Sequence, residues 1–407
     1  MSEAAVIADH VPAHVPAELL IDFDIYDNLE PGQDVFERWH DLSLECQRSN
    51  RPLLFTPRLG GHWIVTEGAA LAELYADTAR LLNSSITIPA LTEHSKIVPG
   101  EADGKEHLYT RRASSRAFTP ASVKAMQPKI RALVDALVEE VAPRGECEFI
   151  SDFALKLPMN LFMSIMELPD EDGPMLRAFS DNVARGATAE IREASRIGLF
   201  DYLATVIDER IANPGTDPIS VMTKAEYFDG VMPRDKVLAM SVNLLLGGLD
   251  TVASFLGFAI KFLSENDVVR RRLATDSAAL DACLTELLRR FPLASLARVV
   301  AHDFTYRGIQ LKQGDRVLLP TMLHGFDDRE YAAPLDFRPE RQIPTLLTFG
   351  RGKHQCLGQF LARYEVREAL AGWLARIPEF RVTVPNDKLE VSCGQVNAFV
   401  KLPLSWG

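Results

Sequence analysis

The longest apolar segment of the chain constrains the fold more than any other feature. Residues 234–264 repeat apolar side chains at a spacing of three and four, which predicts one long helix. Within it, residues 242–260 are apolar on nearly every side. Such a helix needs other elements around it, because water would otherwise contact its apolar surface. We therefore expect this helix to run through the middle of a large core.

Helical periodicity also dominates the rest of the chain. The same spacing predicts helices at 34–46, 69–76, 105–118, 120–141, 154–166, 190–211, 277–291 and 357–377. Extended segments are short and lie at 52–66, 304–311, 315–319 and 380–404. This order predicts a mostly α fold with small β-sheets, α+β rather than alternating strands and helices. Residues 1–20 are expected to form a flexible N-terminal arm.

Composition and charge argue against several classes of protein. With 44 Lys and Arg against 56 Asp and Glu, the net charge is −12, which argues against nucleic acid as a partner. Neither a run of 18 apolar residues nor a charged-then-apolar leader pattern occurs, so we expect no membrane anchor and no signal peptide. The five cysteines are odd in number and lack C-x-x-C spacing, as in proteins of a reducing cytosol. We expect a cytoplasmic enzyme.

Residues 349–358 carry the strongest functional signal. They read Phe-Gly-Arg-Gly-Lys-His-Gln-Cys-Leu-Gly and place one thiol, Cys356, behind a glycine-rich turn and before the helix predicted at 357–377. The positive end of the helix dipoles favours the thiolate by about 0.3–1 kcal/mol, and a thiolate can be an axial ligand of haem iron. Gly352 and Gly358 lack a Cβ, so the backbone could approach a flat macrocycle there. A lone cysteine is more often a small buried side chain, so distant segments must agree with this interpretation.

The spacing Phe349-x-x-Gly352-x-His354-x-Cys356-x-Gly358 resembles the haem-binding loop of cytochrome P450 monooxygenases. Within this family the chain resembles the bacterial camphor-hydroxylase subfamily over about residues 23–406. This resemblance implies a single P450-type domain at 21–407. It also implies haem b as the cofactor and Cys356 as the ligand of its iron. Phe349, Gly352, His354 and Gly358 would then belong to the haem site.

The predicted central helix contains a second motif, Gly247-Gly248-Leu249-Asp250-Thr251. Two glycines inside a helix cost about 1 kcal/mol each relative to alanine, and a carboxyl group in apolar surroundings is costly unless it has a partner. Such local violations tend to mark functional sites. Gly247 would leave room for dioxygen, Thr251 could donate a proton to it, and Asp250 could relay protons from solvent. The motif resembles the acid–alcohol pair of the P450 oxygen-binding helix; the alternative is a kinked core helix with a satisfied Asp–Thr pair.

The two carboxylates of haem need cationic partners. His107 and Arg111 are four residues apart on one predicted helix, so both can point at the same propionate. They match the family's His-x-x-x-Arg pattern, and the resemblance adds Arg298 and His354 as further propionate ligands. Any one of these residues alone is more often an ordinary surface charge.

Other arginines are expected in supporting roles. Arg177 and Arg185 stand where related enzymes bind the aspartate of the oxygen-binding helix, and a solvated basic face is the alternative. Glu286 and Arg289 form an i, i+3 pair. The segment 337–341 resembles the family's meander, whose arginine would join this pair. We assign the resulting triad to folding and not to chemistry.

Departures from the camphor hydroxylases concern the substrate. The stretch 92–99 has no tyrosine to hold a ketone, and Asn243 replaces an apolar residue one turn before Gly247, which argues against camphor itself. We expect a terpenoid or norisoprenoid of similar size, such as an ionone-like ketone held by His94, Ser95 or Asn243. Ligand pockets are mostly apolar, and the other residues expected to line this one are Leu246, Leu293, Ala294, Gln395 and Val396.

The resemblance implies that electrons reach the haem from another protein. We expect an acidic [2Fe–2S] ferredoxin, served by an NADH-linked ferredoxin reductase, to bind a basic patch by charge attraction. The patch would consist of Arg111, Arg112, Arg351, Lys353, Arg363 and Arg376. The predicted activity is hydroxylation of a small apolar substrate by a monomeric enzyme. The alternatives are a peroxide-driven peroxygenase, against which the intact Asp250–Thr251 pair argues, and a non-enzymatic haem-thiolate sensor.

Overall fold

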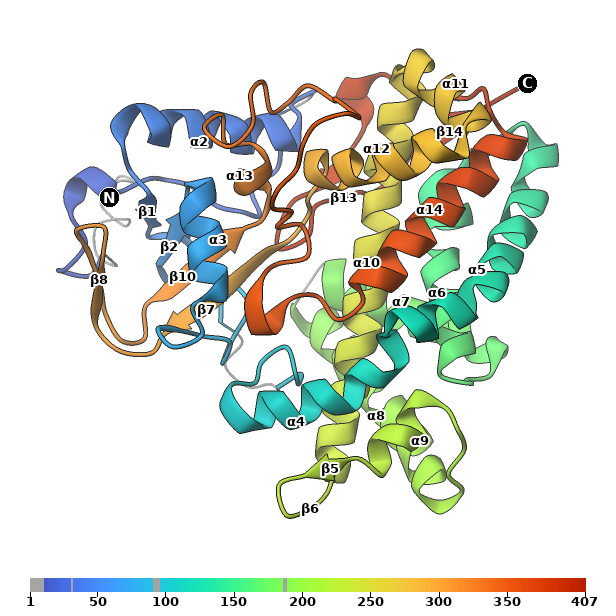
Figure 1. Ribbon diagram of the computed structural model, residues 1–407, viewed down its shortest axis with the longest axis horizontal. Coiled ribbons are helices and arrows are strands. Elements are labelled where there is room, and N and C mark those ends of the chain that lie inside the picture. Colours follow the sequence, from blue (N-terminus) through green and yellow to red (C-terminus); the bar gives the residue numbers. More distant parts are fainter. Residues whose placement is uncertain (1–10, 31, 91–95, 186–188) are drawn as a thin grey trace. The chain divides into compact units, whose positions relative to one another are not determined.

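The computed structural model describes residues 11–30, 32–90, 96–185 and 189–407. They form two compact units, each built from several stretches of chain. The first, here called the sheet unit, comprises Met1–His94, Ala282–Cys356 and Asn386–Ala398 within these limits. The second, the helical unit, comprises Ser95–Asp281, Leu357–Pro385 and Phe399–Gly407. Helices are much more abundant than strands (Figure 1), which confirms the predicted mostly α fold with small sheets.

A five-stranded sheet organises the sheet unit. Its strand order is β1-β2-β10-β7-β3, with β10 parallel to β2 and antiparallel to β7. Every residue of β1 and β2 is buried, which explains their largely apolar sequence. The elements of this unit are β1 Leu53–Thr56, β2 His62–Val65, β3 Leu81–Leu82, β7 Ser295–Val300, β8 Phe304–Tyr306, β9 Ile309–Leu311, β10 Arg316–Pro320, β12 Val391–Ser392, α2 Val35–Ser49, α3 Gly68–Ala76 and α13 Met322–Gly325.

The segment 11–20, which we expected to belong to a flexible arm, packs against this sheet. Val15 and Leu19 are buried, and the imidazole of His14 lies 2.8 Å from a carboxylate oxygen of Asp315. Directly after the segment, the Ile21 N–H donates to the carbonyl oxygen of Phe55 at 2.9 Å. Apolar side chains of this segment therefore belong to the core, which its sequence alone did not indicate.

A buried triad of one carboxylate and two arginines joins helix and meander. Glu286 lies on α12 (Ser277–Arg290), a helix divided between the two units, and accepts from Arg289 at 2.7 and 2.8 Å. Arg341 donates to the same carboxylate at 3.1 Å. All three side chains are at most 7% exposed. The prediction that the meander arginine completes this triad is confirmed.

The helical unit is built around α10 (Arg234–Glu265), which contacts α6, α8 and α14. Helix α14 also lies along α5 (Figure 1). The other elements of this unit are α4 Gly104–Ser115, α5 Pro120–Val141, α6 Lys156–Ile165, α7 Gly173–Arg185, α8 Ala189–Ala212, α9 Pro218–Thr223, α11 Asp267–Thr275, α14 Gln359–Arg376, β4 Glu146–Glu148, β5 Glu226–Tyr227, β6 Gly230–Val231, β11 Arg381–Val382 and β14 Pro403–Ser405. Strand β13 (Ala398–Phe399) is divided between the units.

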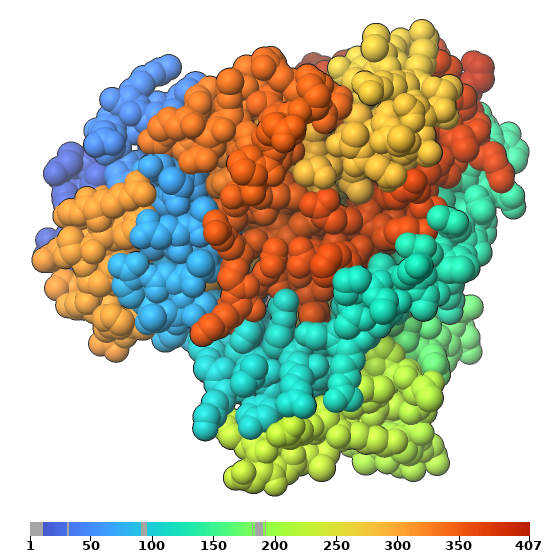
Figure 2. Space-filling model, in the orientation of Figure 1, coloured from blue at the N-terminus to red at the C-terminus, as the bar shows by residue number. Residues whose placement is uncertain are grey.

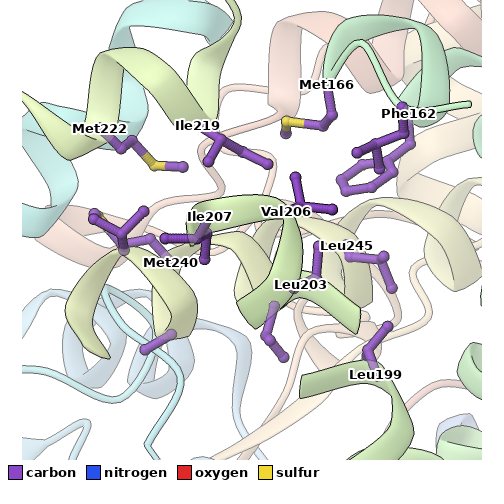
Figure 3. Close-up of a cluster of buried hydrophobic side chains, with 14 of the residues drawn as sticks. Phe162, Met166, Leu199, Leu203, Val206, Ile207, Ile219, Met222, Met240 and Leu245 are labelled. Atoms are coloured by element: carbon purple, nitrogen blue, oxygen red, sulfur yellow. The ribbon is translucent and has the colours of Figure 1, made fainter. Parts of the chain in front are cut away.

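One face of α10 is the centre of a large apolar cluster. Leu245 of this helix belongs to one cluster with Leu203 and Ile207 of α8, Met222 of α9 and Phe162 of α6 (Figure 3). All five side chains are at most 8% exposed. The expectation that the segment 234–264 forms the central helix of the core is therefore confirmed for this unit.

Helix α10 is also long and apolar enough to cross a membrane, with a mean hydropathy of 1.5 over an 18-residue window. The absence of an uninterrupted apolar run, from which we expected no such segment, was therefore too strict a criterion. Of that window, 67% is buried inside the protein. This burial is typical of the core helix of a globular protein, which satisfies the same criteria of length and composition.

Helix α11 was not predicted, because an arginine occupies a position that periodicity assigns to an apolar residue. Arg270 is 3% exposed, and only Leu273 is buried beside it on this helix. The Arg270 guanidinium donates to the carbonyl oxygens of Leu263 and Pro378 at 2.9 and 3.0 Å and to the Glu379 carboxylate at 2.6 Å. These hydrogen bonds offset the cost of removing the guanidinium charge from water, so Arg270 can be buried.

The carboxyl group of Glu365 on α14 should make the stability of the protein depend on pH. This residue is 3% exposed, its Oε1 atom has no hydrogen-bond partner, and burial raises its pKa from 4.5 to about 8. The folded state then holds a proton that the unfolded state loses above pH 4.5, so stability falls as pH rises from about 4.5 to 8. We expect Glu365→Gln to remove this loss, which is about 3 kcal/mol at pH 7.

Denaturant unfolding at pH 5 and pH 8 measures this effect. Glu368→Gln is the matched control, because Glu368 is also buried but accepts from Arg131 at 2.9 Å and from Arg367 at 2.6 Å. The control should destabilise the protein at both pH values. An equal pH dependence in the wild type and in Glu365→Gln would contradict the assignment.

Candidate active site

The middle of α10 carries a half-exposed stripe between buried residues. Asn243, Leu246, Asp250 and Thr251 are half-buried and Gly247 is exposed, whereas residues 240–242, 245, 249 and 252–260 are buried. The spacing of three and four puts the first five residues on one side of the helix, and the adjacent Leu244 and Gly248 widen the accessible surface. A Cβ at Gly247, or at the neighbouring Gly248, would meet no atom within 4 Å. The predicted shared face of Gly247 and Thr251 is thus present.

The polar groups of this stripe have different surroundings. The Thr251 hydroxyl donates to the carbonyl oxygen of Gly247 at 3.1 Å, a bond that tends to bend a helix. Of the two arginines expected near Asp250, Arg177 forms no ion pair with it in the described part of the chain. The side chain of Arg185 lies outside the described residues. The countercharge expected from Arg177 is therefore not found.

The loop that ends in Cys356 is a tight turn against α3. The Cys356 N–H donates to the carbonyl oxygen of Phe349 at 2.8 Å, and the Cys356 side chain is exposed. Gly352 has a φ of 78°, and a Cβ there would lie 3.0 Å from the Cα of Ala76. We expected Gly352 to be required by a close approach to a macrocycle. The structure gives another reason, which is the positive φ together with the approach of α3.

Tyr75, at the end of α3, was missed by the sequence analysis. Its hydroxyl donates to the carbonyl oxygen of Leu319 at 2.7 Å, and burial raises its pKa to about 12. A Cβ on Gly350 would lie 3.5 Å from the Tyr75 ring, and the guanidinium carbon of Arg298 lies 5.4 Å from the ring centroid. One aromatic ring thus supports both the cysteine loop and Arg298. Its position in the sequence contains no signal of this role.

The four expected propionate ligands are divided evenly between the units. In the sheet unit, Arg298 on β7 is 3% exposed and donates to the Ala297 carbonyl oxygen at 2.7 Å, and His354 is half-buried in a short helical turn. In the helical unit, α4 carries His107, which is 7% exposed, and Arg111, which is half-buried. Each unit therefore supplies two basic side chains.

The comparisons with known proteins identify the family. The family model for cytochrome P450 matches residues 195–405, more than half of the chain. The chain belongs to the cytochrome P450 family. Its similar relatives include the probable cytochrome P450 127A1 of Sinorhizobium fredii, 29% identical over 91% of each chain. Nocardicin C N-oxygenase of Nocardia uniformis is 31% identical over 75% of this chain and 78% of its own length.

Solved structures extend the similarity to nearly the whole of this P450. CYP101J2 matches with a TM-score of 0.88 and 33% identity, covering 98% of this chain and 99% of its own. CYP101C1 matches with a TM-score of 0.88 and 34% identity, covering 98% and 100%. These matches confirm a bacterial P450 that resembles the camphor-hydroxylase subfamily. The protein is a monooxygenase and has haem b as its cofactor.

The residues present in this P450 fit that cofactor. Cys356 offers an exposed sulfur at the end of the glycine-containing turn, and thiolates are established haem ligands. The open surface beside Gly247 and Gly248 would be filled by any side chain at these positions. Gly358 likewise has no atom within 4 Å of an ideal Cβ. The thiol of the sheet unit can hold such a group by sulfur, and the glycines of the helical unit lack the side chains that would obstruct a flat macrocycle.

Four of the expected pocket residues of this P450 are brought together in the sheet unit. Ala294 and Val396 form an antiparallel bridge, and the adjacent Leu293 and Gln395 take part through backbone hydrogen bonds of 3.4 and 2.8 Å. The Gln395 amide donates to the carbonyl oxygen of Ile86 at 2.7 Å, so it holds the loop in place. In the helical unit, Asn243 and Leu246 lie on the stripe of α10. His94 and Ser95 lie outside the described residues.

Proposed function

We propose that this P450 hydroxylates a small apolar terpenoid or norisoprenoid, such as an ionone-like ketone, with electrons from a [2Fe–2S] ferredoxin and its NADH-linked reductase. The overall reaction converts RH, O2, two electrons and two protons into ROH and water. The observation that carries the proposal is the half-exposed stripe of α10, where Gly247, Asp250 and Thr251 interrupt a buried apolar helix. We further propose that residues 21–407 form one P450 domain of a cytoplasmic, monomeric protein.

Each residue of the site has a proposed role. Cys356 binds the iron of the haem, which supplies the oxidising chemistry when bound. His107, Arg111, Arg298 and His354 hold the propionates by charge. Phe349, Gly352 and Gly358 shape the cysteine loop, and Gly247 leaves space for dioxygen beside α10.

Proton delivery is assigned to the pair on α10. The Thr251 hydroxyl donates a hydrogen bond to the Gly247 carbonyl oxygen, one turn earlier on the helix. A change of rotamer would break this bond and allow the hydroxyl to donate to the reacting oxygen instead. The half-buried Asp250 carboxylate can take protons from solvent and pass them on. Two protons are consumed in each turnover with dioxygen.

Thr251→Ala is expected to lower the product formed per NADH about tenfold and to divert electrons to hydrogen peroxide. The control is Thr205→Ala on α8, because the Thr205 hydroxyl also donates to the carbonyl oxygen four residues earlier, Asp201, at 3.2 Å. Product, NADH and peroxide are measured together. Unchanged coupling in Thr251→Ala would refute the role of the hydroxyl. Peroxide-driven turnover that exceeds ferredoxin-driven turnover in the wild type would favour the peroxygenase alternative.

The pocket residues support a small apolar substrate. Leu246, Leu293, Ala294 and Val396 are aliphatic and contribute no charge, as is usual in pockets for apolar ligands. We propose that these side chains contact the hydrocarbon part of the substrate, and that Asn243 contacts the oxygen of a ketone. Binding is measured through the spin-state change of the ferric haem on titration with terpenoids. A complete lack of response to such ligands would contradict the substrate class.

The docking of ferredoxin is proposed to depend on the exposed cations of the cysteine loop, Arg351 and Lys353. Both are exposed and form no ion pair with other described residues. By contrast, Arg112 of α4 is paired with Glu226 of β5 at 3.2 Å, and Arg376 with Glu139 at 3.3 Å. Figure 2 shows the teal surface of α4 next to the yellow-green surface of the segment that contains β5 and β6. Arg111 and Arg363 are half-buried, and burial lowers the pKa of Arg363.

Lys353→Glu is expected to slow electron transfer from an acidic ferredoxin about tenfold at low salt and to weaken its dependence on ionic strength. The control is Lys388→Glu, which makes the same change of charge at another exposed lysine of the sheet unit. Stopped-flow reduction of the ferric protein at several salt concentrations measures both. Equal rates for the two variants would remove Lys353 from the docking surface.

A further inference from the structure

Asn243 places an unpartnered amide on the half-exposed stripe of α10. Its neighbours in the chain, Val242, Leu244, Leu245 and Leu246, are all aliphatic. The Asn243 side chain is half-buried, and no hydrogen bond to it is present among the described residues. Its polar atoms are not among the buried side-chain atoms that lack a hydrogen-bond partner, so water can reach the amide in the free protein. A ligand that displaces this water must itself supply a hydrogen-bond partner, because an amide left unpaired on binding is costly.

Gly100 determines how this amide is oriented. An ideal Cβ at Gly100 would lie only 2.7 Å from Oδ1 of Asn243. The amide oxygen thus rests against the backbone of Gly100, and the Nδ2 group points away from it. Any larger residue at position 100 would displace the oxygen.

The segment that contains Gly100 is a fixed wall of the helical unit. Val98 and Ala102 are 1% and 2% exposed and belong to the same apolar cluster as Leu245. Glu101 is 1% exposed and its carboxylate accepts from the Ile97 N–H at 3.2 Å, while its own N–H donates to the Ile97 carbonyl oxygen at 2.8 Å. Because these contacts fix the segment, Gly100 can set the position of the amide with little freedom.

We propose that Gly100 and Asn243 together form the polar recognition element of the substrate pocket. Gly100 holds Oδ1, and Nδ2 donates a hydrogen bond to one oxygen acceptor on an otherwise apolar substrate. This inference rests on the proposed function and specifies its substrate as a compact hydrocarbon skeleton with one acceptor, such as a ketone. Asn243 precedes Gly247 by one helical turn, about 6 Å along the axis, so the proposed contact to the substrate oxygen lies one turn away from the position proposed for dioxygen.

Gly100→Ala is a mild way to test this arrangement. The φ of Gly100 is not in the positive range that disfavours alanine, so the backbone accepts a Cβ. The new methyl group would meet the end of the flexible Asn243 side chain at 2.7 Å and the Ile97 carbonyl oxygen at 3.4 Å. We therefore expect the fold to persist and the amide to shift.

The experiment compares holoenzyme of the wild type, Gly100→Ala, Asn243→Leu, Asn243→Asp and the double variant Gly100→Ala/Asn243→Leu. Each is titrated with α-ionone, β-ionone and camphor, and with the hydrocarbon in which CH2 replaces the C=O of each ketone. Dissociation constants come from the Soret shift. We expect the preference for ketone over hydrocarbon to fall about 3- to 10-fold in each single variant. Gly100→Ala should add nothing once Asn243 is leucine.

Asn243→Asp separates hydrogen bonding from shape. It keeps an oxygen to rest against Gly100 but has no N–H donor when ionised, so it should lose the ketone preference as leucine does. The regioselectivity of hydroxylation should broaden in all single variants. Thermal unfolding midpoints verify that each variant is folded.

Two results would overturn the proposal. One is a ketone preference that is equal in the wild type and in Asn243→Leu, and the other is a full Gly100→Ala effect in the Asn243→Leu background. A different result, no Soret response of any form to any of the six ligands, would instead refute the proposed terpenoid function and with it the recognition element.

Discussion

Replacing Cys356 by serine is expected to lower substrate hydroxylation about 10³-fold or more while the protein stays folded. The Cys356 side chain is exposed, and the hydrogen bond that fixes the turn comes from its backbone N–H to Phe349. The substitution therefore removes little packing. A serine hydroxyl remains protonated at neutral pH and is a much poorer iron ligand than a thiolate.

Three measurements check this expectation: haem content, the absorption spectrum of the ferrous–CO complex, and product formation. Cys393→Ser is the control, because Cys393 is half-buried in the sheet unit and burial raises its pKa, which keeps it as an inert thiol. The control should match the wild type in all three. If Cys356→Ser kept the thiolate type of CO spectrum and the wild-type rate, another residue would have to be the iron ligand.

Glu286→Ala is expected to destabilise the protein by about 3–5 kcal/mol, the usual consequence of removing one partner from a buried ion pair. The Glu286 carboxylate accepts from Arg289 and from Arg341, whose side chains are 1% and 7% exposed. Without it, both guanidinium groups lose their anion, and only backbone acceptors such as the Gly325 carbonyl oxygen remain for Arg289. Haem retention should fall together with stability.

Denaturant unfolding followed by tryptophan fluorescence measures this loss. Asp336→Ala is the control, because the Asp336–Arg338 pair at 2.8 Å is exposed to solvent and such pairs contribute about 0–1 kcal/mol. The two carboxylates are both close to the meander but differ in burial. A loss below about 1 kcal/mol in Glu286→Ala would mean that the triad does not stabilise the fold.

The helices were predictable where apolar residues face the core at regular spacing. The prediction for 234–264 differs from α10 by one residue, because burial of Leu245, Leu249 and their neighbours follows the period of 3.6 directly. Helix α11 was missed, since Arg270 is buried through hydrogen bonds to carbonyl oxygens and to Glu379. No pattern of apolar residues indicates a helix of this kind.

The sequence predicted which residues form the candidate site, but it did not predict all of the contacts that require them. The motif at 247–251 indicated the stripe on α10, because a glycine pair and an acid are unfavourable inside an apolar helix. The glycine at 352 was recognised, but its requirement comes from Ala76 on α3, 276 positions earlier. The sequence does not show which segments approach each other, so Tyr75 and Gly100 were missed.

The sequence by itself determined the helical character of the chain, the motif around Cys356 and the acid–alcohol pair on the central helix, because local spacing sets which side chains share a face. Only the tertiary structure decided which strands pair in the order β1-β2-β10-β7-β3 and that Gly100 meets Asn243. Contacts between residues so far apart in the chain depend on how the elements pack in three dimensions. This packing produces no periodic pattern in the sequence.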